Sequence, residues 1–244
     1  MPEQLHLITY RIWKNLPMCQ KRIVYYECEN RECNLRFPDL RDDMPRERCP
    51  VCRGRVRVVL TIDAPQNENQ APTLSSTKPK LEAMLDNVRS GLNVGSIFRS
   101  ADGIGVSKLY LCGITPNPEN PAVRKTSLGA EQNVSWDHVS NGVVKVRELK
   151  MAGYSIWGLE SVPSAISLYK VDEEIKGEAL ILVVGNEVCG IDPNILALCD
   201  QIVSIPMVGI KRSLNVASAF GIAASYLRYR QILSQGSETK LPNI

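Results

Sequence analysis

The chain has only two histidines, His6 and His138, and neither lies in a cluster of polar residues. This scarcity disfavours a Ser-His-Asp or Cys-His catalytic apparatus, so any chemistry must proceed without a histidine base. No G-x-G-x-x-G sequence follows a strand pattern, and no Walker A sequence is present, which disfavours the two common glycine-rich nucleotide sites. Internal repeats and low-complexity tracts are also missing.

Long apolar runs are missing too. No segment approaches eighteen consecutive apolar residues, and the first residues do not resemble a signal peptide. The 244 residues are 44% hydrophobic, enough for one sizeable core and a small extra module. We therefore expect a soluble, cytoplasmic protein without a membrane partner.

The net charge of +3 is unevenly distributed along the chain. Residues 1–60 hold twelve Lys and Arg, ten of them Arg, against eight Asp and Glu. The remainder is slightly acidic. Arginine suits bidentate contacts to phosphate, so the N-terminal quarter is a candidate for binding nucleic acid, although a solvated basic face is a common alternative.

Four of the eight cysteines form two close pairs with the spacing C-x4-C-x15-C-x2-C. Two pairs separated by a loop suit a tetrahedral structural zinc site, and Gly54 follows the second pair where a knuckle turn needs it. Free thiols or disulfides are the alternatives, and disulfides are disfavoured without a secretion signal. The predicted ligands are Cys28, Cys33, Cys49 and Cys52. The apolar surroundings of Cys112, Cys189 and Cys199 predict inert core residues.

The chain is predicted to contain two domains. Strand patterns at 22–27 and 55–62 flank the cysteine pairs and predict a small β-rich zinc ribbon over 1–62. A polar, proline-containing linker spans 63–80. From 81 to 244, apolar strands alternate with helices, which predicts an α/β domain with a parallel sheet covered on both faces. The expected strands are 81–88, 108–112, 154–159, 179–184 and 201–205, and the expected helices are 94–103, 139–152, 193–198 and 214–233.

Three polar clusters lie at strand-to-helix junctions, where a doubly wound sheet forms its ligand crevice. The first runs from Asn87 to Arg99, the second from Val183 to Ile191, and the third from Ile205 to Ala219. In the first, Asn93 is a candidate helix cap, Gly95 permits close backbone approach, and Arg99 is predicted to pair with a phosphate or a structural carboxylate. In the third, Ser213 is the expected N-cap, with Asn215 inside the first turn.

Together the segments NVGSIFR (93–99), GNEVCGI (185–191) and IPMVGIKRSLNVASA (205–219) resemble the three motifs of the SpoU RNA ribose 2′-O-methyltransferases, within the SPOUT superfamily. The resemblance covers about 81–235. It implies an α/β parallel sheet with a C-terminal deep trefoil knot, a homodimer with active sites completed across its interface, and tRNA or rRNA as substrate. It also implies S-adenosylmethionine as cofactor, bound at Leu159, Gly185, Glu187, Ile205, Met207, Leu214, Asn215 and Ala217.

The same resemblance implies roles for particular side chains. Arg99 is the catalytic arginine; it holds an RNA phosphate and polarises the 2′-hydroxyl rather than acting as a literal base, because its pKa is too high. Asn93 and Asn215 orient the substrate and Arg99. Glu187 orients the loop or pairs with Arg99. Ser213 caps the last helix, and Lys125, Lys211 and Arg212 add phosphate contacts.

Two other functions remain open. The first is an RNA-binding protein that kept the knot but lost catalysis, which the joint presence of Asn93, Arg99, Glu187 and Asn215 disfavours. The second is a zinc-ribbon transcription or translation factor, which leaves the second domain unexplained. Many relatives carry a different N-terminal extension, so the ribbon leaves the target RNA undetermined; it binds either RNA or protein.

Overall fold

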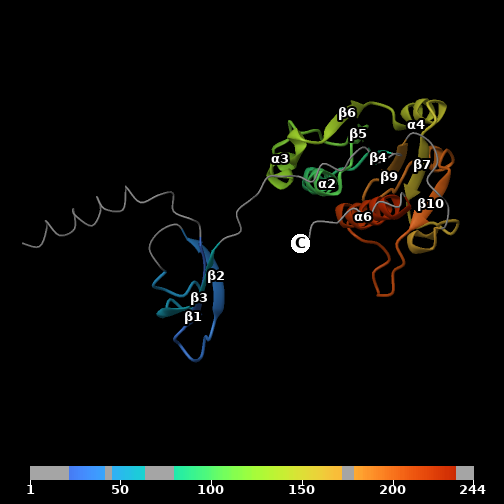
Figure 1. Cartoon of the computed structure of the whole chain (residues 1–244). Coiled ribbons are helices and arrows are strands. Elements are labelled where there is room, and N and C mark those ends of the chain that lie inside the picture. The colour runs from blue at the N-terminus through green and yellow to red at the C-terminus, as the bar shows by residue number, and fades with distance from the viewer. Residues whose placement is uncertain (1–21, 42–45, 64–79, 172–178, 235–244) are drawn as a thin grey trace, which may run out of the picture. The chain divides into compact units, whose positions relative to one another are not determined.

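A computed structural model of the chain describes residues 22–41, 46–63, 80–171 and 179–234. The chain divides into two compact units, Met1–Ala71 and Pro72–Ile244 (Figure 1). The predicted linker lies almost wholly outside the described residues, as does His6. Among the described residues, no helix has the length and apolarity needed to cross a membrane.

The first unit contains a three-stranded antiparallel sheet in the order β2-β1-β3. Strands β1 (Arg22–Cys28) and β3 (Val56–Asp63) match the two expected strands within one residue. Strand β2 (Arg36–Arg41) was not predicted, because Pro38 and three charged residues interrupt the apolar alternation typical of a strand. Proline is tolerated there because β2 is an edge strand. The buried Tyr26 stacks on Phe37 and supplies most of the small core.

The second unit is built on a seven-stranded sheet in the order β6-β5-β4-β9-β7-β10-β8, and every neighbouring pair is parallel. This confirms the expected α/β class with a parallel sheet. The strands are β4 (Lys80–Asp86), β5 (Lys108–Cys112), β6 (Ser135–Val139), β7 (Ser155–Leu159), β8 (Ile166–Ser167), β9 (Ala179–Val184) and β10 (Gln201–Ser204).

Helices cover both faces of this sheet, as expected. Alternate residues of β4 point to opposite faces: Leu85 packs in one buried cluster and Met84 in the other. The first cluster receives α2 (Gly91–Ile104), α3 (Pro121–Ser127) and α6 (Val216–Ser234). The second receives α4 (Gly142–Met151) and α5 (Pro193–Leu196). Figure 1 shows α4 and α6 on opposite sides of the strands.

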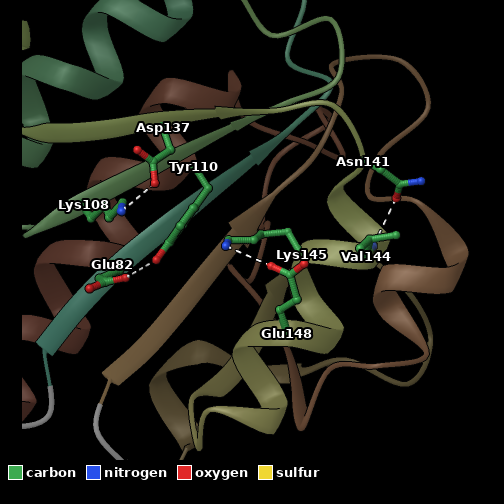
Figure 2. Close-up of polar contacts among 8 residues, drawn as sticks. All are labelled: Glu82, Lys108, Tyr110, Asp137, Asn141, Val144, Lys145 and Glu148. Carbon is green, nitrogen blue, oxygen red and sulfur yellow. Dashed lines mark hydrogen bonds and ion pairs between the residues drawn. The ribbon is translucent and has the colours of Figure 1, made fainter.

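Element ends are where the sequence prediction was least accurate. Helix α3 and strands β6 and β8 were not predicted, and the helix expected from Val139 begins at Gly142. The reason is capping: the Asn141 side chain accepts a hydrogen bond from the Val144 N–H at 3.1 Å (Figure 2). Asn120 caps α3 in the same way, with a proline at its first position.

A buried polar pair lies beneath α4. The Tyr110 hydroxyl donates to Glu82 Oε2 at 2.9 Å, and both residues are under 7% exposed. Burial raises the pKa of Tyr110, as does the neighbouring Glu82 carboxylate. Lys108 and Lys145, which pair with Asp137 and Glu148, both lie against the Tyr110 ring (Figure 2).

We expect Tyr110→Phe to destabilise the second unit by about 1–3 kcal/mol, because Glu82 would lose its donor in a buried environment. Urea unfolding measures the change. Tyr229→Phe is the matched control, since Tyr229 is exposed on α6. Equal stabilities of the two variants would contradict a stabilising role for the pair.

Candidate functional site

A pocket of about 390 Å³ lies at the carboxyl ends of three neighbouring strands, β7, β9 and β10. This is the edge at which parallel α/β sheets bind ligands. Its walls come from four segments, each of which follows a strand or enters α6: 159–161, 184–190, 204–207 and 212–219. Two of the three polar clusters identified in the sequence, the second and the third, therefore meet at one place.

Seven of the eight residues expected to hold the cofactor line this pocket. They are Leu159, Gly185, Glu187, Ile205, Met207, Leu214 and Asn215. The eighth, Ala217, packs against the buried core instead, while its neighbours Val216 and Ala219 line the pocket. The mixture of apolar walls with a few polar groups suits a small organic ligand.

Two glycines in the loop that lines the pocket have no room for a side chain. A Cβ on Gly185 would lie 2.3 Å from backbone atoms of Gly190 and Ile191, so only glycine fits there. Gly190 has a φ of +73°, and a Cβ on it would lie 2.5 Å from Glu160 Oε2. Loop 185–191 can fold tightly only because both side chains are missing.

We expect Gly185→Ala to displace this loop and to weaken binding of small ligands at the pocket at least tenfold. Calorimetric titration with S-adenosylmethionine measures the effect. Gly103→Ala is the matched control, because a Cβ there would meet no atom within 4 Å. Unchanged affinity in Gly185→Ala would show that the ligand binds elsewhere.

A hydrogen-bonded chain of side chains connects all three motifs. Asn215 Nδ2 donates to Asn93 Oδ1 at 3.0 Å, and Asn93 Nδ2 donates to Glu187 Oε1 at 2.9 Å. Glu187 also accepts the backbone N–H groups of Arg89 and Ser90. These contacts join residues that are 94 to 122 positions apart in the sequence, so they fix the three motifs against one another.

The charge of Glu187 is stabilised by this arrangement. Burial alone would raise its pKa, but the N–H groups of Arg89, Asn93 and Ser90 outweigh burial and hold the pKa below its ordinary value. Glu187 therefore stays ionised at neutral pH, and its contribution to folding stability is lost only as the pH falls through this lowered pKa. It acts as an acceptor that orients Asn93.

Helix capping at the site differs from expectation. The prediction that Ser213 caps the last helix was wrong: α6 begins at Val216, and Asn215 Oδ1 accepts the N–H groups of Ala217 and Ser218. Ser213 is exposed and lines the pocket. Similarly, Ser90 rather than Asn93 caps α2. Gly95 does allow close approach, because a Cβ there would lie 2.2 Å from Val123 O.

The basic residues near the site are exposed. Arg99 lies on α2, about 120° around the helix from Asn93, and does not line the pocket. Its side chain makes no hydrogen bond or ion pair with any residue that the structure describes, Glu187 included. Lys125 lies within α3 rather than in a loop. Lys211 and Arg212 are exposed beside the pocket, and Arg212 lines it.

Two further polar residues at the pocket were missed. Glu160 Oε2 accepts the Ile191 N–H at 3.0 Å, which joins the end of β7 to loop 185–191. Asn186 Nδ2 donates to Asn87 O at 2.7 Å. Glu160 directly follows the predicted strand 154–159, so its position at a parallel strand's carboxyl end was an available signal.

The four paired cysteines of the first unit converge. Their sulfur atoms all lie within 4.8 Å of one another, with Cys28 and Cys52 at 3.4 Å and Cys33 and Cys49 at 3.8 Å. Ligands about 2.3 Å from a tetrahedral zinc ion are separated by roughly 3.8 Å, so this set fits the metal. The Gly54 N–H points to Cys52 Sγ at 3.4 Å, as a knuckle requires.

Among the described residues, Cys112, Cys189, Cys199 and His138 belong neither to the cysteine cluster nor to the pocket lining. Cys112 is buried and Cys199 is half-buried, as expected, but Cys189 is exposed on the loop after β9, so its prediction as a core residue was wrong. His138 is exposed, with its ring 3.1 Å from Gly113 O.

Comparison with known proteins identifies the same region. The SpoU rRNA Methylase family model matches residues 80–225. A tRNA (guanosine(18)-2′-O)-methyltransferase from Aquifex aeolicus is 31% identical over 150 residues, covering 61% of this chain and 69% of that protein. The 23S rRNA (guanosine-2′-O-)-methyltransferase RlmB from Xanthomonas axonopodis is 34% identical over 157 residues, covering 64% and 61%.

A solved structure shares the fold. The AdoMet-bound rRNA methyltransferase from Sinorhizobium meliloti superposes with a TM-score of 0.58 at 26% identity. The match covers 62% of this chain and 56% of that one. The N-terminal unit with its cysteine cluster lies outside the residues that the family model matches.

Proposed function

Because the chain belongs to the SpoU rRNA Methylase family, we propose that it transfers a methyl group from S-adenosylmethionine to a ribose 2′-hydroxyl of tRNA or rRNA. Relatives that share residues of the second unit are named as 2′-O-methyltransferases of both RNA classes. A structural neighbour holds the cofactor. The chain spans between about three fifths and seven tenths of these relatives.

The observation that carries this proposal is the pocket with its attached network. Seven of the eight predicted cofactor residues line a single cavity, and Asn215 belongs both to that cavity and to the chain through Asn93 to Glu187. A substrate oriented by these amides would lie next to a ligand in the pocket. This proximity is what a direct group transfer requires.

The reaction needs positioning and the removal of one proton. The cofactor supplies an electrophilic methyl group; a bond forms from the ribose 2′-oxygen to that carbon while the carbon–sulfur bond breaks. Asn93 and Asn215 hold the ribose, and Glu187 fixes the orientation of Asn93. Arg99 binds the neighbouring RNA phosphate and polarises the hydroxyl, whose proton passes to that phosphate.

We also propose that a trefoil knot surrounds the pocket and that the cofactor contacts Leu159, Gly185, Ile205, Met207 and Leu214. The protein is further proposed to be a cytoplasmic homodimer in which the partner subunit's Arg99 completes each site. The position of Arg99 outside the pocket of its own subunit supports this arrangement. Ser213, Lys125, Lys211 and Arg212 are proposed to contact RNA phosphate.

The first unit is proposed to be a zinc ribbon that binds RNA, preceding a methyltransferase domain that begins near residue 81. The fit of the four sulfurs to a tetrahedral ion supports the metal. The excess of arginine over acidic residues in 1–60 supports RNA as the ligand.

Nucleoside mass spectrometry of tRNA and rRNA from a deletion strain tests the function and finds the target. Loss of one 2′-O-methylated nucleoside, restored by the wild-type gene, is the expected result. If every ribose methylation persisted and the purified protein bound RNA but no S-adenosylmethionine, the chain would instead be an RNA-binding protein without catalysis.

A further inference from the structure

The arginines of the first unit fall into two groups that the sequence does not distinguish. One group pairs with carboxylates: Arg22 with Asp63, both Arg36 and Arg57 with Glu27, and Arg46 with Asp39. The other group, Arg31, Arg48, Arg53 and Arg55, forms no ion pair within the described part of the chain. Three of these four lie around the second cysteine knuckle, at Arg48, Arg53 and Arg55.

The backbone holds these three side chains close together. Arg48 and Arg55 face each other across an antiparallel bridge, so their side chains leave the same side of the hairpin. Arg53 lies at the turn between them with a φ of +62°, and its carbonyl accepts a hydrogen bond from Arg48 Nη1 at 3.4 Å. All three residues are exposed.

The turn itself is held by the cysteine cluster. The Cys49 N–H donates to Gly54 O, and the Arg53 N–H donates to Cys49 O, while both cysteines of the knuckle belong to the converging sulfur set. Three guanidinium groups are thus presented from a short, fixed loop. Such a group matches a row of phosphates better than a scattered basic face does, because its members need not be brought together on binding.

We infer that Arg48, Arg53 and Arg55 form the RNA contact of the first unit and bind the phosphate backbone without reading bases. The inference rests on the proposed function for the identity of the polyanion. Its physical basis is charge. When an exposed arginine without a carboxylate partner contacts an RNA phosphate, cations condensed on the RNA are released, and this release favours binding. Arginines already paired with Asp63 or Glu27 gain less, because each must first give up its carboxylate.

The test compares two triple variants of the full chain that remove the same charge. One is Arg48→Gln/Arg53→Gln/Arg55→Gln, at the knuckle, and the other is Arg22→Gln/Arg36→Gln/Arg57→Gln, on the strands. The strand arginines are a fair control because their side chains are 55–64% exposed. Binding of an unmodified tRNA transcript is measured from low to high salt.

The slope of log affinity against log salt should be smaller by about 2 in the knuckle variant than in the wild type. If the two proteins bind equally at 1 M salt, the variant then binds roughly 100-fold more weakly than the wild type at 0.1 M salt. The strand variant should keep most of the wild-type slope. Equal slopes for the wild type and the knuckle variant would overturn the inference, and this is the result expected if the knuckle binds a protein instead. An equal reduction of the slope in both variants would overturn it as well.

Zinc content and cofactor affinity are measured on the same two variants. Zinc content should match the wild type in both; loss of zinc from the knuckle variant alone would mean that its arginines serve to balance the thiolate charge, which would also overturn the inference. Affinity for S-adenosylmethionine should be unchanged. If the wild type itself bound no S-adenosylmethionine, the proposed function would fail, whereas a wild type that methylates RNA with an unchanged knuckle slope would refute this inference only.

Discussion

Replacing Arg99 with alanine should lower the rate of RNA methylation by roughly 10²–10⁴-fold and leave S-adenosylmethionine affinity unchanged. The reason is position: Arg99 is exposed on α2 and lies outside the pocket, and its side chain binds no other described residue. It is therefore free to meet a phosphate. Single-turnover methylation and calorimetric titration measure the two quantities separately.

Arg147→Ala is the matched control for this experiment. Arg147 is equally exposed but lies on α4, which packs on the opposite face of the sheet from α2. Near-normal methylation by Arg99→Ala would contradict the central role of Arg99. Loss of cofactor affinity in Arg99→Ala would instead show that Arg99 contributes to cofactor binding.

Mixed subunits test whether Arg99 acts across a dimer. Arg99→Ala and Glu187→Ala subunits should each be inactive alone. After random mixing, half of the dimers are heterodimers, and each of these has one site with both residues intact, so about a quarter of the wild-type activity should return. No recovery would place Arg99 and Glu187 of one site in the same subunit.

Removing zinc should unfold the first unit and leave the second intact. Within residues 22–41 and 46–63, Tyr26 is the one large side chain that is fully buried. Structural zinc supplies about 10–16 kcal/mol in small cysteine sites. We therefore expect Cys49→Ser, or a strong chelator, to abolish the dispersed amide signals of residues 22–63. Signals of residues 80–234 should persist.

Two-dimensional NMR and a colorimetric zinc assay measure these effects. Cys189→Ser is the matched control, because Cys189 is an exposed cysteine outside the cluster. One equivalent of zinc should be released from the wild type and from this control. A folded first unit in metal-free protein would contradict the proposed dependence on zinc.

The sequence predicted the sheet and the place of the site because both depend on strong patterns. Apolar runs such as Ala179–Val184 specify buried parallel strands, and the residues that follow such strands gather at one edge. The cofactor residues themselves were assigned by the resemblance to the SpoU family, and seven of them line the pocket at this edge. The cluster of four cysteines was equally predictable from the sequence, because metal ligands occur at characteristic spacings.

The details that were missed depend on contacts between distant segments. The Asn93 side chain is bound by Asn215 and Glu187, which lie 122 and 94 positions away in the sequence, and Ser90 caps α2 instead. The partition of arginines into paired and unpaired groups depends on strand register. Neither is visible in a local window of sequence.

The distance of these partners along the chain has a consequence during synthesis. Asn215 caps α6 and completes the pocket, and it lies 122 residues after Asn93. The walls at 159–161, 184–190 and 204–207 are translated first and have no opposing segment. A nascent chain therefore cannot complete the pocket until residues 212–219 have left the ribosome. A chain truncated before that point would lack this wall of the pocket.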